Sequence, residues 1–268
     1  MNTFDFDDNF LQIIDSLKNN DNVDCIALGG SRATGNNDSK SDYDIYVYCK
    51  EILTAEERST ALLSLCSVAE ICNHYWESED NCVMNNGVSV DIIYRKIDLM
   101  GRYLEMVVDN GHSFNGYTTA FWHNIITSKV LFDKSGEFTQ LQKKYTIPYP
   151  KTLKKNIIEN NRKLLNGTLP SYDKQIKKAS DRNDIVSVNH RITEFLASYF
   201  DIIFAINELT HPGEKRLVEL CKRDCKILPK NFEDNINMLF ASIANGKAYE
   251  FAVKMVEELD LILQTIEV

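Results

Sequence analysis

Long apolar runs are missing from this 268-residue chain, which has neither a stretch of about 18 apolar residues nor an apolar leader segment. We therefore expect no membrane span and no secretory signal. Its seven cysteines are odd in number and include no Cys-x-x-Cys pair. This pattern excludes the usual disulfide framework and zinc site, and it favours buried free thiols in a reducing cytosol. We therefore expect a cytoplasmic protein.

Positive charge is also scarce. The chain has 30 Lys and Arg against 39 Asp and Glu, which gives a formal net charge of −9. An acidic chain lacks the broad basic surface of a nucleic-acid-binding protein, so nucleic acid is not favoured as a partner. The hydrophobic fraction of 44% and charged fraction of 26% are typical of a globular protein with one large domain or two modest ones.

Two patterns of secondary structure divide the chain. Up to about residue 135, short apolar runs alternate with amphipathic segments, which predicts strands mixed with helices. After Pro148 and Pro150, nearly every segment has helical periodicity. We therefore predict an α/β domain over 1–147 and an α-helical bundle over 151–268. The predicted strands are 23–28, 44–49 and 88–94, with 74–84 ambiguous; the predicted helices are 4–19, 54–72, 97–109, 151–165, 172–181, 184–208, 213–224, 230–245 and 247–266.

A glycine turn follows the first predicted strand directly. Gly29, Gly30 and Ser31 come immediately after the apolar run 23–28. Glycine lets the backbone turn sharply and leaves amide N–H groups accessible to a ligand. If a helix begins near Ser31, its free N–H groups and its dipole favour an anion. The turn is therefore a candidate phosphate site.

Three aspartates form a candidate metal site. Asp42 and Asp44 are two residues apart at the start of a predicted strand, so their side chains project from the same face. Two such carboxylates repel each other unless one is protonated or a cation lies between them. Asp91 lies inside the apolar run 88–94, where an acid is unfavourable unless it is paired or bound to metal. If this strand neighbours strand 44–49, the three acids can hold Mg²⁺ beside a bound triphosphate.

The combination resembles a known superfamily. The stretch GGSRATGNNDSKSDYDIYVY, residues 29–48, is similar to the DNA polymerase beta-like nucleotidyltransferases, whose signature is a Gly-Ser turn, then Asp-x-Asp, then a distal Asp. The resemblance implies a mixed central sheet with flanking helices, and so an α+β fold with the helical bundle behind it. It also implies Mg²⁺-dependent transfer of a nucleoside monophosphate from a nucleoside triphosphate. The positions that match the signature are Gly30, Ser31, Asp42, Asp44 and Asp91.

The second half of the chain is similar, more loosely, to the aminoglycoside and lincosamide nucleotidyltransferases, which carry an α-helical second domain. Residues 130–141 and 204–216 carry this likeness. The likeness implies that 151–268 binds the acceptor. It also implies that an acid of the long helix, Glu194 or Asp184, serves as general base, with Asp91 as the competing candidate.

Two cations are candidate phosphate ligands. Arg32 follows Ser31 directly, and Lys215 follows the Pro212-Gly213 turn. Arg32 either contacts phosphate or covers the turn. Lys215 either reaches the triphosphate or lies in solvent at a helix start.

The sequence therefore predicts an enzyme that moves a nucleoside monophosphate to a hydroxyl of a small, cationic, antibiotic-like acceptor and releases pyrophosphate. ATP is the first candidate, although no motif separates it from GTP. Two alternatives stay open. One is a nucleotidyltransferase that modifies a protein or belongs to a toxin–antitoxin pair, and the other is a nucleotide-binding module without catalysis. The acceptor and the oligomeric state are not specified.

Overall fold

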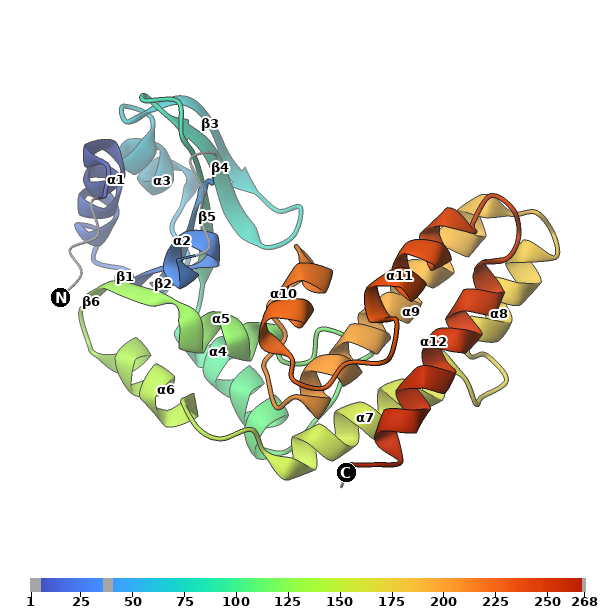
Figure 1. Ribbon diagram of the computed structural model, residues 1–268. Coiled ribbons are helices and arrows are strands. Elements are labelled where there is room, and N and C mark those ends of the chain that lie inside the picture. Colours follow the sequence, from blue (N-terminus) through green and yellow to red (C-terminus); the bar gives the residue numbers. More distant parts are fainter. Residues whose placement is uncertain (1–5, 36–40, 267–268) are drawn as a thin grey trace. The chain divides into compact units, whose positions relative to one another are not determined.

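The computed structural model describes residues 6–35 and 41–266. The chain divides into two compact units. The first comprises residues 1–104 and 124–146, and the second comprises 105–123 and 147–268 (Figure 1). The segment 105–123 precedes the predicted boundary at 147–151 and packs with the helical unit. No helix in the described part of the chain is both long enough and apolar enough to cross a lipid bilayer.

A six-stranded mixed sheet forms the centre of the first unit, with the strand order β3-β4-β5-β2-β1-β6. Strands β2 and β5 pair in parallel, whereas the other neighbouring strands are antiparallel. This arrangement confirms the predicted α+β class with a mixed sheet. The strands are β1 (Val23–Leu28), β2 (Tyr43–Cys49), β3 (Cys66–Asn73), β4 (Ser78–Met84), β5 (Ser89–Arg95) and β6 (Lys129–Asp133).

Helices α1 (Asp8–Lys18) and α3 (Ala55–Leu62) lie on the same face of this sheet (Figure 1). Phe10 and Ile13 of α1 and Leu62 of α3 join a core cluster with Ile45 and Val47 of β2. Because side chains alternate along a strand, burying these residues directs Asp42, Asp44 and Tyr46 to the opposite face. The other helices that begin in the first unit or cross its boundary are α2 (Gly30–Thr34), α4 (Ile97–Leu104), α5 (Ala120–Thr127) and α6 (Glu137–Tyr145).

One predicted helix is wrong in extent. The pattern over 54–72 predicts a single helix, and its capping box is present, since Thr54 and Glu57 bond each other's backbone N–H groups. The helix nevertheless ends at Leu62, and 66–73 forms strand β3, which pairs with β4. The ambiguous segment 74–84 supplies that partner strand. Backbone pairing with β4 therefore overrides the local helical periodicity.

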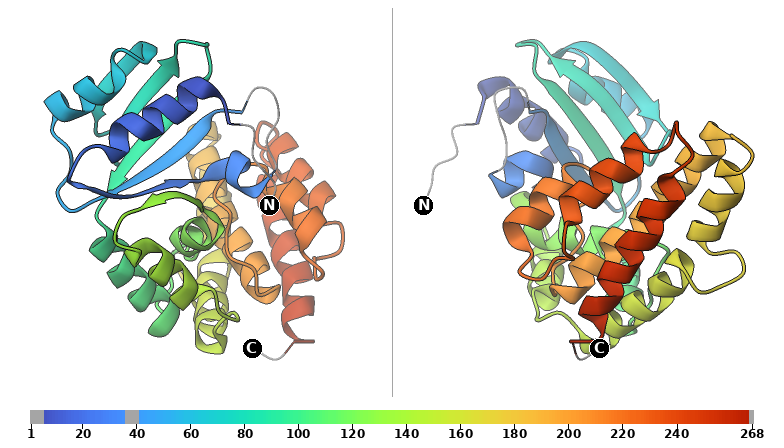
Figure 2. Two further views of the ribbon diagram at one scale, coloured as in Figure 1. Left: turned by 90° about the vertical axis from the view of Figure 1, so that its left-hand side faces the viewer. Right: turned by 45° about the vertical axis from the view of Figure 1, so that its right-hand side comes forward.

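The second unit is built from helices. Its long helix α9 (Ile185–Ile206) is buried along most of its second half, and contacts α7 (Lys151–Leu165) and α8 (Tyr172–Ser180). Helix α8 also packs against α12 (Ala248–Leu263), and the right-hand view of Figure 2 shows these two helices side by side. The remaining elements are a π-helix (Glu105–Asp109) that continues α4, then α10 (Leu217–Asp224) and α11 (Phe232–Ala241).

Candidate metal centre

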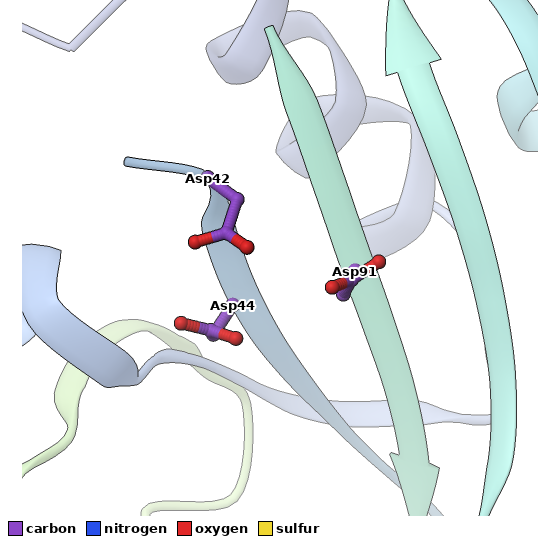
Figure 3. Close-up of side chains that lie close together, drawn as sticks. All are labelled: Asp42, Asp44 and Asp91. Atoms are coloured by element: carbon purple, nitrogen blue, oxygen red, sulfur yellow. The ribbon is translucent and has the colours of Figure 1, made fainter. Parts of the chain in front are cut away.

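Three carboxylates meet on the open face of the sheet. Asp42 and Asp44 project from the start of β2, and the parallel pairing of β2 with β5 places Asp44 directly beside Asp91. One oxygen from each side chain lies within 4.8 Å of the others, and all three residues are partly buried. Figure 3 shows the three side chains on two neighbouring strands. The predicted condition, that strand 88–94 neighbours strand 44–49, is met.

The glycine turn lies against this cluster. The Gly29 amide donates a hydrogen bond of 2.8 Å to the carbonyl oxygen of Asp44, which ties the turn to β2. Gly30 has φ of +62°, and a Cβ added there would lie 1.8 Å from Asp44 Oδ2. A Cβ at Gly29 would lie 2.2 Å from the Tyr46 ring. Glycine is therefore needed because the Asp44 carboxylate and the Tyr46 ring fill the space beside the turn.

Arg32 contacts the backbone that carries the acids. Its Nη2 donates to the Ser41 carbonyl oxygen at 2.6 Å, and its Nε donates to the Asp42 carbonyl oxygen at 2.9 Å. The guanidinium also lies 4.0 Å from the centre of the Tyr43 ring. Of the two roles considered for Arg32, these contacts favour covering the turn and fixing the start of β2. Its role as a phosphate ligand stays a prediction.

A second polar network underlies the cluster. The Arg95 guanidinium lies 4.3 Å from the centre of the Tyr46 ring, and it also binds Glu77 at 2.5 Å and Asn124 at 3.0 Å. Burial raises the pKa of the Tyr46 hydroxyl, the Arg95 charge opposes this increase, and the Asp44 carboxylate adds to it. The Tyr46 hydroxyl therefore stays protonated at neutral pH, and adds no charge to the three acids.

Sequence reasoning missed Asn81. It lies directly opposite Asp91 in the antiparallel pair of β4 and β5, and its Nδ2 donates a hydrogen bond of 2.9 Å to Asp91 Oδ1. The turn residues Asn85 to Gly87 were a usable signal, because a hairpin folded at this turn pairs residue 81 with residue 91. The ambiguity over 74–84 hid that signal.

The donor set fits a hard divalent cation. Mg²⁺ takes oxygen ligands, and it is commonly held by one or two carboxylates together with phosphate oxygens and water. Asp42, Asp44 and Asp91 supply carboxylate oxygens alone, with no sulfur or imidazole in the cluster. The Asp44 carboxylate lies where a Cβ of Gly30 would be, so the glycine turn lies directly against one of these acids.

The other predicted site residues belong to the second unit. Glu194 is an exposed residue of α9, and Lys215 is exposed just before α10. Asp184 caps the start of α9, where it accepts hydrogen bonds from the amide and the hydroxyl of Ser187 at 3.0 and 2.6 Å. The Ser187 donors lower the pKa of the Asp184 carboxyl, which disfavours Asp184 as a base.

A cavity of about 660 Å³ lies within the helical unit. Glu214 and Tyr117 contribute to its lining. Burial raises the pKa of the Tyr117 hydroxyl, and the carboxylates of Glu214 and Glu194 add to this increase. Apolar side chains of α9, α10 and α11 form much of the remaining lining: Leu196, Phe200, Leu217, Val218, Ile236 and Phe240.

Comparisons with known proteins give two family matches. Residues 11–75 match the model for polymerase beta, nucleotidyltransferase. This match includes Gly30, Asp42 and Asp44 but ends before Asp91. Residues 119–216 match a domain of unknown function, DUF4037.

The chain also has similarity to solved structures. One is a nucleotidyltransferase-like protein from Exiguobacterium sibiricum 255-15, with 11% identity, a TM-score of 0.41, and coverage of 96% of this chain and 73% of that one. Another is an aminoglycoside 6-adenyltransferase from Bacillus subtilis, with 11% identity, a TM-score of 0.27, and coverage of 93% and 90%. The comparison with curated proteins gave no match.

Proposed function

We propose that this chain, whose residues 11–75 match the polymerase beta nucleotidyltransferase model, transfers a nucleoside monophosphate from a nucleoside triphosphate to a hydroxyl of a small acceptor and releases pyrophosphate. The observation that carries this proposal is the meeting of Asp42, Asp44 and Asp91 beside the glycine turn. ATP is the first nucleotide to test.

Each group of site residues has a separate proposed role. Asp42, Asp44 and Asp91 would hold Mg²⁺, which when bound neutralises phosphate charge and acidifies a hydroxyl. The backbone N–H groups at Gly30 and Ser31 orient the triphosphate by donating to its oxygens. Asp91 is well placed to accept the proton of the attacking hydroxyl, because it lies at the edge of the cluster farther from the turn-bearing strand. Glu194 is retained as the second candidate base, and Lys215 as a further phosphate ligand.

The helical unit is proposed to bind the acceptor, and its cavity is the candidate site. A volume of about 660 Å³ lies within the usual range for small-molecule pockets. Two ion pairs in its lining, Arg216 with Glu219 and Lys222 with Glu233, neutralise four of its charges. Glu214 makes no ion pair within residues 6–35 and 41–266. The cavity therefore favours an acceptor with an apolar body and one amine over a highly polar polycation.

Calorimetry of ATP binding tests the nucleotide site directly. Wild-type protein should bind ATP tightly only when Mg²⁺ is present, and Asp42→Ala with Asp44→Ala should abolish that dependence. The matched control is Asp98→Ala, which removes an exposed acid of the same unit that pairs with Arg102. Metal-dependent binding that survives the double substitution would contradict the proposed site.

Pyrophosphate release then tests transfer. Amino alcohols that carry an aromatic group, such as tryptophanol, are suitable first acceptors, and an aminoglycoside is the polycationic comparison. Asp44→Ala should abolish release, and full activity in that variant would refute the assignment. Mass spectrometry of the protein and of cell extracts distinguishes protein modification from small-molecule transfer. Tight ATP binding without release under any acceptor would identify a binding module.

A further inference from the structure

We propose that Asn81 is a positioning residue for the metal centre, and that Asn73 fixes its orientation. This role rests on the proposed function, because it assumes that Asp91 binds the metal. The two amides form a chain of hydrogen bonds across three strands: Asn73 on β3, Asn81 on β4 and Asp91 on β5. Asn73 Nδ2 lies 2.8 Å from Asn81 Oδ1, and Asn81 Nδ2 lies 2.9 Å from Asp91 Oδ1.

This chain determines which way the Asn81 amide points. A carboxylate only accepts hydrogen bonds, so Asn81 must turn its NH₂ group toward Asp91. Its carbonyl oxygen then faces β3, where Asn73 supplies a donor. Asn73 Nδ2 also lies 3.3 Å from Glu70 Oε2, a second acceptor, which fixes the Asn73 amide in the same sense. The Asn81 amide is therefore held on both sides, and the Asn73 NH₂ group is held by two acceptors.

A backbone irregularity brings Asn73 to this position. The pairing of β3 with β4 shifts register between Glu70 and Asn73, and Cys72 has φ of +61°. The Cys72 amide donates a hydrogen bond of 2.7 Å to Asp80 Oδ1. Bulges commonly redirect a side chain next to an active site. Asp80 thus stabilises the bulge that directs Asn73 toward Asn81.

A neutral hydrogen-bond donor such as the Asn81 amide can orient a metal-binding carboxylate such as Asp91 without neutralising it. Asn81 fixes the Asp91 carboxylate through one lone pair and leaves its other lone pairs for a cation. An amide adds no positive charge, so Asp91 keeps the full negative charge that attracts the metal. A Lys or Arg opposite Asp91 would fix the carboxylate equally well but would compete with the cation. Residues that orient metal ligands typically change metal affinity by about 10- to 100-fold when removed.

Binding of Mn²⁺ alone, measured by electron paramagnetic resonance without nucleotide, tests the role apart from catalysis. Asn81→Leu keeps the approximate shape and removes the donor, and it should weaken Mn²⁺ binding by about 10-fold or more. Asn73→Ala should weaken it by about threefold alone, and should add nothing in a protein that already carries Asn81→Leu. Asn85→Ala is the control, because it removes one exposed hydrogen bond of 3.1 Å to Ser64 in the same hairpin.

Kinetics supply a second readout. For Asn81→Leu, the Mg²⁺ concentration at half-maximal pyrophosphate release should rise by the same factor as the Mn²⁺ dissociation constant, whereas kcat should recover at saturating Mg²⁺. If circular dichroism shows that Asn81→Leu does not fold, Asn73→Ala is tested in its place, because Asn73 is only partly buried.

Three outcomes oppose the assignment. Mn²⁺ affinity within about twofold of wild type in Asn81→Leu would overturn it, as would additive effects of Asn73→Ala and Asn81→Leu. If Asn81→Leu does not fold, wild-type Mn²⁺ affinity in Asn73→Ala would overturn it. Failure of the proposed function is separately recognisable, because wild-type protein would then bind no Mn²⁺ that depends on Asp42 and Asp44.

Discussion

The buried carboxyl of Asp201 offers a sharp test of how the helical unit responds to pH. Asp201 lies on α9 and is 2% exposed. Its Oδ2 accepts a hydrogen bond of 2.6 Å from the Thr118 hydroxyl, and its Oδ1 accepts one of 3.1 Å from the Thr118 amide. Burial raises the pKa of Asp201 from 3.8 to about 7, although the Thr118 donors act in the opposite direction. The perturbation is Asp201→Asn, which cannot ionise.

The direction in which the free energy of unfolding changes with pH follows from proton uptake at Asp201. Between pH 3.8 and about 7 the folded protein binds a proton at Asp201 that the unfolded chain does not. The free energy of unfolding therefore falls as the pH rises through this window, and the loss is complete above pH 7. A raised pKa of this size corresponds to at most about 4 kcal/mol. We expect Asp201→Asn to be more stable than wild type at pH 8 by about 2 to 4 kcal/mol, with the difference shrinking toward pH 5.

Urea unfolding at several pH values measures this difference. The chain has two tryptophans, and Trp122 is buried in the same unit as Asp201, whereas Trp76 is 89% exposed in the first unit. A Trp76→Phe background makes Trp122 the sole tryptophan reporter. Other groups that titrate are common to both proteins and cancel in the comparison. A difference that stays constant from pH 5 to 8, or that grows toward pH 5, would refute the reasoning.

Three further outcomes are expected. Gly30→Ala would place a Cβ 1.8 Å from Asp44 Oδ2 at a φ of +62°, so metal-dependent ATP binding should fall by more than about 10-fold in calorimetry; unchanged binding would contradict the packing described. Burial lowers the pKa of His123 to about 4, so stability is lost as the pH falls from 6.5 toward 4. In His123→Gln, the loss of unfolding free energy on acidification should be smaller by about 3 kcal/mol. Identical acid unfolding midpoints for the variant and wild type would show that His123 does not cause this loss. Asp80→Ala leaves the buried Arg58 guanidinium without its carboxylate partner, and should lower the free energy of unfolding by about 3 to 5 kcal/mol in urea, whereas a loss below about 1 kcal/mol would count against a buried pair.

The sequence was sufficient to predict the three-acid arrangement. Two acids on the same face of a strand, Asp42 and Asp44, and a third acid in an apolar strand, Asp91, are each unfavourable. A shared metal ion explains both features. That prediction needed just one assumption, namely that two strands are neighbours, and the parallel pairing of β2 with β5 supplies it. Residues 23–28 and 151–165 also form the predicted elements with the predicted bounds. The roles of the site residues stay predictions.

The rest depends on long-range pairing that local patterns do not encode. Residues 66–73 have a periodicity compatible with a helix, and only the ladder with β4 makes them a strand. The two roles left open for Arg32 could not be separated from the sequence either. Its backbone acceptors are the carbonyl oxygens of Ser41 and Asp42, 9 and 10 residues away, and local sequence patterns do not predict contacts of this kind.

Strand β4 links the stability of the first unit to the geometry of its metal centre. Asp80 and Asn81 are consecutive and face opposite sides of the sheet, so a one-residue slip of β4 in either direction would turn each to the other face. A slip in one direction would place Asn81 where Arg58 and Tyr94 now bind Asp80, and Arg58 would lose its carboxylate partner. A slip in the other direction would place Asp80 opposite Asp91, where it would add a like charge. The buried ion pair on one face and the acids on the other therefore both favour the register that places the neutral amide of Asn81 beside Asp91.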